Sequence, residues 1–107
     1  MPAMVAQHPV MMRFRKALEA AYGPRLERAV LYGSRARGEA RPDSDWDVAV
    51  FIRDPERFGI ELGRLADLET DILYDTGEVI NALPFGAGTY GDATGFMSEV
   101  REDGIDL

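Results

Sequence analysis

The sequence predicts an α/β (α+β) domain in which helices and short strands alternate along the chain. Apolar residues recur at three- and four-residue spacing over residues 10–22 and 58–73, as they do in helices that bury one face. Short runs suited to strands lie at residues 29–32, 48–52 and 78–83. A chain of 107 residues has room for one such domain but none for an added substrate-binding domain. We therefore expect its partner to be bound from outside.

The first helix is expected over residues 9–22 and ends where Gly23 and Pro24 follow. Its apolar stripe is assigned to the core rather than to a cofactor pocket, because stripes of this kind usually pack inside. The stripe consists of Val10, Met11, Phe14, Leu18, Ala21 and Tyr22. Residues 1–8 are expected to form a flexible tail, and His8 within it is assigned no role.

The stretch 31–51 carries the residues that suggest chemistry. A strand that ends at Gly33 and a second strand over residues 48–52 flank it. In an extended chain the side chains of Asp45 and Asp47 leave the same face, with their Cα atoms about 7 Å apart. Paired carboxylates repel each other, and a hard divalent cation such as Mg²⁺ relieves that repulsion. The spacing therefore predicts a metal site.

The turn at Gly33 and Ser34 offers groups that bind phosphate. Glycine lets the chain leave the strand and lets a ligand come close, while Ser34 can cap the short helix expected over residues 35–38. Backbone N–H groups at a helix start attract phosphate. Guanidinium groups that suit phosphate oxygens follow the turn, at Arg35, Arg37 and Arg41. Each feature alone also fits an ordinary polar turn or a solvated basic loop, so the prediction depends on their joint spacing.

The next segments supply the frame of the domain. A long helix is expected with Asp54 as its cap, Pro55 in its first turn and Gly77 at its end. A third strand is expected over residues 78–83 and should stop at Pro84, because proline donates no hydrogen bond to a sheet.

Two later segments complete the chain. Residues 86–88 form a glycine-rich loop that lacks the Lys-Ser/Thr of a P-loop, so we interpret it as a connector. Residues 93–102 are typical of an amphipathic helix that covers the sheet or a partner, with Ile105 as a further apolar position.

The charge of the chain argues against a general nucleic-acid binder. A formal net charge of -7 and a sequence pI near 4.6 repel a nucleic-acid backbone, so no direct nucleic-acid partner is expected. The chain has no cysteine, which excludes disulfides and thiolate metal sites. The first residues are unlike a signal peptide and no apolar stretch reaches membrane-spanning length. We expect a cytoplasmic protein with no membrane partner.

The motif as a whole resembles a known family. Gly33-Ser34, ten intervening residues and then Asp45-x-Asp47 are the pattern of minimal nucleotidyltransferases of the DNA polymerase β superfamily, including the type that acts as an antitoxin. Ala36-Arg37-Gly38 after the serine and Ser44 before the first aspartate strengthen the likeness. The resemblance implies a single minimal nucleotidyltransferase domain over residues 1–107, built on a small mixed β-sheet with helices packed on one side.

The resemblance also implies an activity. Members transfer AMP from ATP to a hydroxyl acceptor with Mg²⁺, usually two ions, and short members modify a tyrosine of a helical HEPN-type toxin with which they form a hetero-oligomer. By this likeness the catalytic carboxylates and metal ligands would be Asp45, Asp47 and Glu78. The groups that bind ATP would be Gly33, Ser34, Arg35, Arg37 and Asp45.

Two other interpretations stay open. The chain could be a small-molecule adenylyltransferase that works with a separate substrate-binding subunit. It could also be a non-catalytic antitoxin that neutralises its partner by occlusion. The second alternative depends on Glu78, the only acid of the third expected strand, which stands at the very start of that strand and could point to either face.

Overall fold

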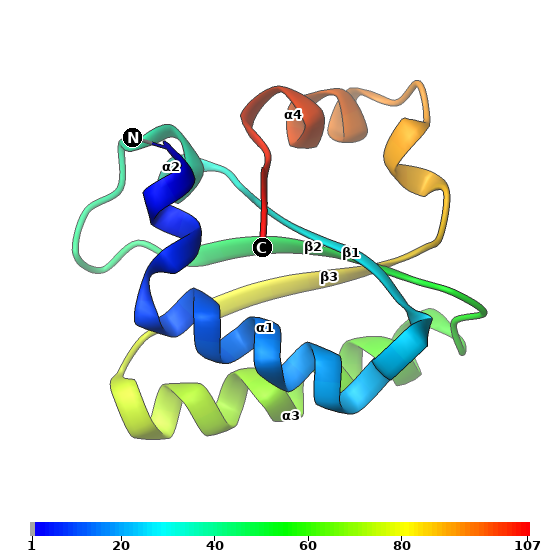
Figure 1. Ribbon diagram of the computed structural model, residues 1–107, viewed down its shortest axis with the longest axis horizontal. Coiled ribbons are helices and arrows are strands. Elements are labelled where there is room, and N and C mark those ends of the chain that lie inside the picture. The colour runs from blue at the N-terminus through cyan, green and yellow to red at the C-terminus, as the bar shows by residue number, and fades with distance from the viewer. Residues whose placement is uncertain (1) are drawn as a thin grey trace.

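The computed structural model describes residues 2–107 (Figure 1). Short 3-10 helices precede and follow the first long helix and precede the last one. The elements in chain order are η1 (Pro2–Gln7), α1 (Pro9–Tyr22), η2 (Gly23–Arg25), β1 (Leu26–Tyr32), α2 (Ser34–Arg37), β2 (Trp46–Ile52), α3 (Phe58–Thr76), β3 (Ile80–Gly86), η3 (Thr89–Gly91), α4 (Gly95–Asp103) and β4 (Ile105–Asp106). None of the helices in this range is both long and apolar enough to cross a membrane.

The strands form one four-stranded mixed sheet in the order β3-β2-β1-β4. Strand β1 is antiparallel to β2 and to β4, whereas β2 and β3 are parallel. The predicted α/β class with a small mixed sheet is therefore confirmed. The register places Tyr32 of β1 opposite Asp47 of β2, and Asp47 in turn opposite Asn81 of β3.

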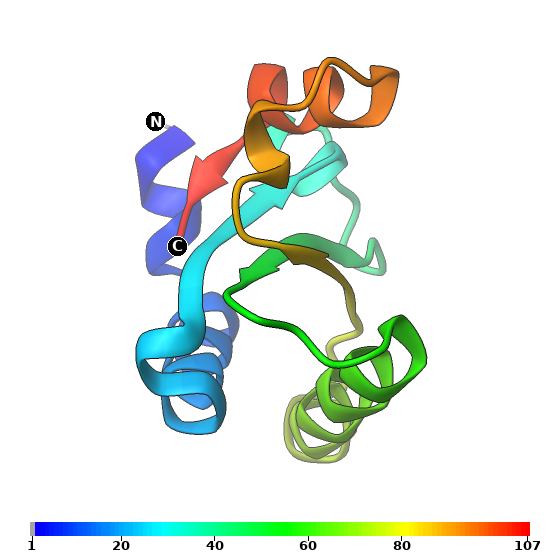
Figure 2. The same cartoon turned by 90° about the vertical axis from the view of Figure 1, so that its right-hand side faces the viewer.

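The two long helices lie on one face of the sheet, whereas α4 lies on the other, so the expectation of helices on one side holds for α1 and α3 and is wrong for α4 (Figure 2). Helices α1 and α3 bury Phe14, Leu18 and Leu65 against the β2 side chains that face them. On the opposite face α4 buries Met97 and Val100 against the side chains of β1 and β2 that point to that face. Because side chains alternate along a strand, each face of β2 carries its own set, and Asp47 belongs to the face that α4 covers.

Helix α3 begins later than expected. The structure starts it at Phe58 with Arg57 as the N-cap residue, so the expected cap at Asp54 and first turn at Pro55 are wrong. Asp54 instead has a positive φ of 49° in the loop before the helix. The backbone N–H of Glu56 in that loop donates to the Glu61 carboxylate at 2.8 Å, which gives the loop a partner inside the helix.

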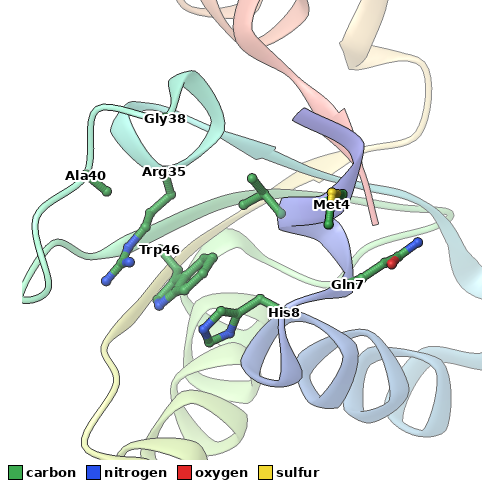
Figure 3. A pocket seen from close by; sticks show the side chains of 8 residues that line it. Met4, Gln7, His8, Arg35, Gly38, Ala40 and Trp46 are labelled. Atoms are coloured by element: carbon green, nitrogen blue, oxygen red, sulfur yellow. The ribbon is translucent and has the colours of Figure 1, made fainter. Parts of the chain in front are cut away.

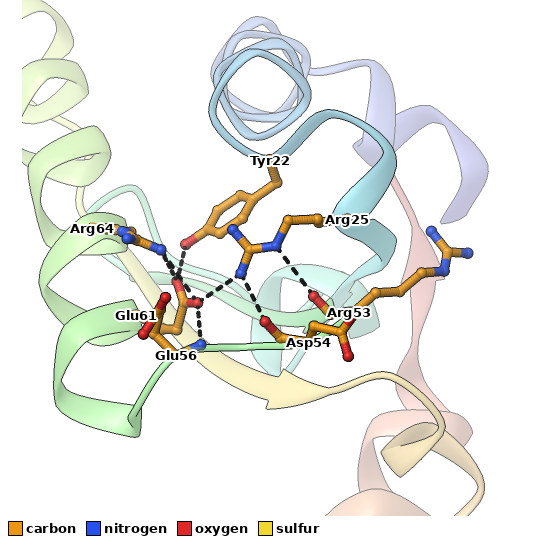
Figure 4. A network of polar contacts seen from close by, with 7 residues as sticks. All are labelled: Tyr22, Arg25, Arg53, Asp54, Glu56, Glu61 and Arg64. Atoms are coloured by element: carbon orange, nitrogen blue, oxygen red, sulfur yellow. Dashed lines mark hydrogen bonds and ion pairs between the residues drawn. The ribbon is translucent and has the colours of Figure 1, made fainter.

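A buried carboxylate ties this loop to α1 and α3 (Figure 4). The side chain of Glu61 has no exposed surface. It accepts hydrogen bonds from the Tyr22 hydroxyl at 3.1 Å, from Arg25 at 3.2 Å and from Arg64 at 3.3 Å. Every oxygen of this buried charge is thus satisfied, as a buried carboxylate requires.

Strand β3 begins and ends later than the sequence suggested. It starts at Ile80 and continues through Pro84 to Gly86, so the expected stop at Pro84 is wrong. Proline is tolerated because β3 is an edge strand, which among residues 2–107 has β2 alone as its strand neighbour. Glu78 precedes the strand, and its side chain is therefore not fixed by the strand's alternation.

Both ends of the chain pack on the domain. Residues 1–8 were expected to be flexible, but Pro2–Gln7 form a 3-10 helix whose Val5 packs against the core; residue 1 lies outside the described residues. His8 caps α1, since its Nδ1 accepts from the backbone N–H of Val10 at 3.2 Å. Ile105 belongs to β4, which pairs with β1, rather than to the last helix.

Candidate functional site

The two aspartates of the motif lie at the start of β2. Asp45 is exposed and directly precedes the strand, and Asp47 is half-buried as its second residue. Burial raises the pKa of Asp47 above its ordinary value, and the negative charge of Asp45 raises it further. The structure therefore brings the two carboxylates close enough for the charge of Asp45 to disfavour the ionisation of Asp47.

The turn at Gly33 lies against Asp47. Gly33 is buried with a φ of 77°, a conformation that glycine adopts without steric cost. A Cβ atom at this position would stand 2.7 Å from Oδ2 of Asp47. The expected phosphate-binding turn and the expected metal-binding carboxylate are thus direct neighbours.

The short helix α2 starts at Ser34, one residue earlier than expected. Gly33 takes the N-cap position, so the expected role of Ser34 as the cap is wrong. Ser34 is half-buried as the first residue of the helix. Its place directly after Gly33 keeps it beside the turn that touches Asp47.

The three arginines after the turn have different surroundings. Arg35 donates to the backbone carbonyl of Ser44 at 2.8 Å and stacks on Trp46, whose side chain lies on the face of β2 opposite Asp47. Arg37 is exposed and pairs at 2.8 Å with Asp103 of α4, which places it on the side of the sheet that carries Asp47, and its charge lowers the pKa of Asp47. Arg41 is exposed in the loop before β2. Arg37 is thus the arginine that lies where it can support a phosphate.

Glu78 does not join the two aspartates. Its Oε2 accepts from the indole Nε1 of Trp46 at 3.1 Å, and the Trp46 side chain points to the face of β2 opposite Asp47. Throughout residues 2–107, no three acidic, histidine or cysteine side chains are grouped closely enough to hold a metal ion. The expectation that Glu78 is the third metal carboxylate finds no support in this geometry.

Asn81 carries no signal in the sequence, yet it occupies the place beside Asp47. It is the β3 residue in register with Asp47, and its Nδ2 lies 3.5 Å from Oδ1 of Asp47. The hydrogen bond favours the ionised form of Asp47 and so offsets part of the rise in its pKa. The third strand thus presents an amide to the site, and only the register of the parallel pair could have revealed it.

Two further groups surround the site and carried no signal in the sequence. Burial, together with the negative charges of Asp47 and Glu99, raises the pKa of Tyr32 to about 12. Glu99 lies on α4, the helix that covers this face of the sheet, and its negative charge also raises the pKa of Asp47. The neutral Tyr32 hydroxyl and the Glu99 carboxylate complete the polar environment of Asp47.

Two cavities flank β2, one on each face. A cavity of about 520 Å³ is lined by His8, Arg35 and Trp46 and lies on the face away from Asp47 (Figure 3). An apolar groove of about 480 Å³ lies on the face of Asp47, between β3 and α4, and its walls include Leu83 and Phe96. The cavity beside Trp46 is thus behind the aspartates rather than at them.

Comparison with known proteins identifies the class. The family model of the nucleotidyltransferase domain matches residues 11–90, and the chain belongs to this family. A Methanocaldococcus jannaschii protein named "Putative protein adenylyltransferase" is 34% identical over 70 residues, which are 65% of this chain and 64% of that protein. The chain thus spans somewhat less than two thirds of the length of this relative.

Solved structures share the fold at low sequence identity. A crystal structure described as a toxin–antitoxin with AMP-PNP is 19% identical with a TM-score of 0.65, over 89% of this chain and 69% of that one. A crystal structure of a mutant of the toxin–antitoxin MntA-HpeT is 20% identical with a TM-score of 0.62, over 90% of this chain and 69% of that one. The nucleotidyltransferase fold expected from the motif is confirmed.

Proposed function

We propose that this chain, acting as one domain over residues 1–107, is an adenylyltransferase that moves AMP from ATP to a hydroxyl acceptor. The observation that carries the proposal is the contact of Gly33 with Asp47, which puts a turn suited to phosphate next to a pair of carboxylates. The relative named as a protein adenylyltransferase and the similar toxin–antitoxin structure with AMP-PNP support the choice of ATP and of a protein acceptor.

The residues at the site fit Mg²⁺, and the proposal includes one or two such ions held by Asp45 and Asp47. Their oxygens are the ligands that Mg²⁺ prefers, and burial and the charge of Asp45 both raise the pKa of Asp47, so a bound cation would offset the repulsion between the two carboxylates. The missing Cβ at Gly33 leaves open the space in front of Oδ2 of Asp47. When bound, the metal would offset charge on the departing pyrophosphate and lower the pKa of the acceptor hydroxyl.

The chain's own groups would bind and orient the triphosphate. The backbone of Gly33 and Ser34 lies beside Asp47, where it can hold terminal phosphate oxygens. Arg37 is close enough to lower the pKa of Asp47 and adds positive charge on the same side. Arg35 is left out of this set, because its guanidinium is bonded to the loop backbone on the other face.

The proposed acceptor is a tyrosine of a helical HEPN-type toxin, with which the chain would form a hetero-oligomer as its antitoxin. The acidic chain, with a net charge of -7, would attract a basic partner over a distance. One observation favours a second candidate, in which the chain neutralises the toxin by occlusion alone. Within residues 2–107 no third carboxylate joins Asp45 and Asp47, which could leave the site unable to transfer AMP.

Intact mass spectrometry separates the two candidates. The toxin encoded beside this chain is incubated with the protein, ATP and Mg²⁺, in parallel with a variant in which Asp45 and Asp47 are both replaced by Asn. A mass gain equal to one or more AMP units, absent with the variant, is the result that the proposal expects. A toxin that is neutralised without any mass gain, by the wild type and the variant alike, would establish occlusion instead.

A further inference from the structure

Trp46 contacts two charged residues, Arg35 and Glu78, and the family motif does not explain this cluster. The residue stands between Asp45 and Asp47 in the chain, and its own side chain is 1% exposed. Its indole Nε1 donates to Oε2 of Glu78 at 3.1 Å. The guanidinium carbon of Arg35 lies 4.3 Å from the centre of the indole ring (Figure 3). We call Trp46, Arg35 and Glu78 the Trp46 brace.

Arg35 connects the brace to the loop that carries the first aspartate. Its Nη2 and Nε donate to the carbonyl oxygen of Ser44 at 2.8 and 3.2 Å, and its Nη2 also donates to Pro42 at 3.3 Å. Ser44 directly precedes Asp45. The backbone is therefore held on one side of Asp45 by Arg35 and on the other side by the packing of Trp46. Hydrogen bonds from a cation are stronger than neutral ones, and the Arg35 side chain is only 15% exposed.

Glu78 holds both other members of the brace. The oxygen that accepts from the indole also lies 3.6 Å from Nη2 of Arg35, so the carboxylate balances the guanidinium charge. A stacked guanidinium beside a buried ring is stabilised by the π face of that ring. Removing the Glu78 carboxylate would free the indole N–H and leave the Arg35 charge without its counter-ion.

We infer that Glu78 and Arg35 are positioning residues, which fix the Asp45-Trp46-Asp47 backbone so that both carboxylates keep their places. The inference rests on the proposed function, because it concerns the same acidic pair. It gives Glu78 a role different from that of a metal ligand. A site built for transfer depends on such support, since a displacement of about 1 Å in a reacting group can lower the rate by about a hundredfold.

Two substitutions of Glu78 test the assignment. Glu78→Gln keeps an oxygen that accepts from the indole, whereas Glu78→Ala removes both interactions. We expect Glu78→Gln to transfer AMP within about threefold of the wild type, and Glu78→Ala to lose about tenfold or more, mostly in kcat. The fluorescence of Trp46, the only tryptophan of the chain, should shift to the red in Glu78→Ala and stay near the wild type in Glu78→Gln. Asp67→Asn, at an exposed carboxylate of α3, is the matched control and should change neither readout.

The outcomes separate this inference from the proposed function. If Glu78→Gln loses transfer and Mg²⁺ affinity as completely as Asp47→Asn, Glu78 is a metal ligand and the inference fails. Wild-type transfer and wild-type emission in Glu78→Ala would also overturn it. If the wild type transfers no AMP, the proposed function fails. In that case the inference stands only if Glu78→Ala has a lower Mg²⁺ affinity and a more red-shifted Trp46 emission than the wild type, with Glu78→Gln between the two.

Discussion

Gly33 and Asp47 approach so closely that a Cβ atom on the first would lie 2.7 Å from Oδ2 of the second. The glycine therefore serves two purposes. Its φ of 77° suits a residue without a side chain, and its missing side chain leaves the front of the carboxylate open. The contact joins the turn after β1 to the start of β2, which are the two halves of the nucleotidyltransferase motif.

Gly33→Ala is expected to abolish AMP transfer as well as to destabilise the fold. With a φ of 77° and a ψ of -159°, the Gly33 backbone lies in a region almost restricted to glycine, which costs alanine about 1–3 kcal/mol, and the new methyl group would displace the Asp47 carboxylate. Gly38→Ala is the matched control, because Gly38 has a φ of 76° with nothing within 4 Å of its Cβ position. Urea unfolding should show a smaller loss for Gly38→Ala, which has only the left-handed backbone cost, than for Gly33→Ala, and only Gly33→Ala should lose transfer. Equal transfer by the two variants would refute the steric argument.

The raised pKa of Asp47 predicts how stability depends on pH when Mg²⁺ is absent. Since burial and Asp45 raise the folded-state pKa above the ordinary 3.8, the folded protein binds a proton more tightly there than the unfolded chain does. The contribution of Asp47 to stability is therefore fully present below pH 3.8 and is lost as the pH rises through the folded-state pKa. Asp47→Asn should remove this contribution, and urea unfolding across that range measures it. Mg²⁺ at neutral pH should stabilise the wild type and leave Asp47→Asn unchanged.

Asn81→Asp is expected to strengthen Mg²⁺ binding. Asn81 lies in register with Asp47, and its amide nitrogen is 3.5 Å from the Asp47 carboxylate. A third carboxylate at this place adds a charged ligand, which should tighten Mg²⁺ by roughly tenfold, equal to about 1.4 kcal/mol. Calorimetric titration gives the affinity directly. Asn81→Leu is the control and should not tighten binding; a gain of the same size in both variants would exclude the carboxylate as the cause.

The buried Glu61 network should contribute to the free energy of unfolding and have no direct effect on AMP transfer. Burial raises the pKa of Glu61, but the N–H of Glu56, the Tyr22 hydroxyl and nearby arginines outweigh it, and the net pKa is lowered. Its stabilising effect is present above the ordinary pKa of 4.5 and is lost as the pH falls through the lower folded value. Glu61→Ala leaves the buried Tyr22 hydroxyl unpaired and should cost about 1–3 kcal/mol, because Arg25 and Arg64 are exposed enough for water to solvate them.

Thermal or urea unfolding at pH 7 and at pH 3 measures this effect. Glu19→Ala is the control, because Glu19 forms an exposed pair with Arg15 and should change stability by less than about 1 kcal/mol. If Glu61→Ala and Glu19→Ala unfold at the same urea concentration, the network is not the anchor of the loop before α3.

The sequence was sufficient for the elements with a strong local pattern. The stripe of α1 and the two strands around the motif follow from periodicity, and the same local pattern predicted that Asp45 and Asp47 act as a pair. The start of α3 did not follow from it. Asp54 and Pro55 look like a helix start, but the carboxylate of Glu61 captures the N–H of Glu56 and holds those residues in a loop. This hydrogen bond forms only when the helix has folded and placed the Glu61 carboxylate beside the loop, so the helix propensities of the single residues do not predict it.

Glu78 and Asn81 illustrate why the sequence did not predict which residue near the third strand lies beside Asp47. A shift of one residue in a strand moves every side chain to the other face, and register depends on the partner strand rather than on the local sequence. Because the register pairs Asp47 with Asn81, it is Asn81 that lies beside the Asp47 carboxylate. Glu78 lies before the strand begins. Strand β4 was missed for a similar reason, because its two residues form a strand only by pairing with distant β1.

The most direct test of the proposed site is the binding of a non-hydrolysable ATP analogue, measured by calorimetry with and without Mg²⁺. The wild type should bind the analogue only with Mg²⁺, and Asp47→Asn should lose that binding while it stays folded. This result would establish that the carboxylate beside Gly33 holds the metal-bound triphosphate. Binding that needs no Mg²⁺, or that survives unchanged in Asp47→Asn, would contradict the account.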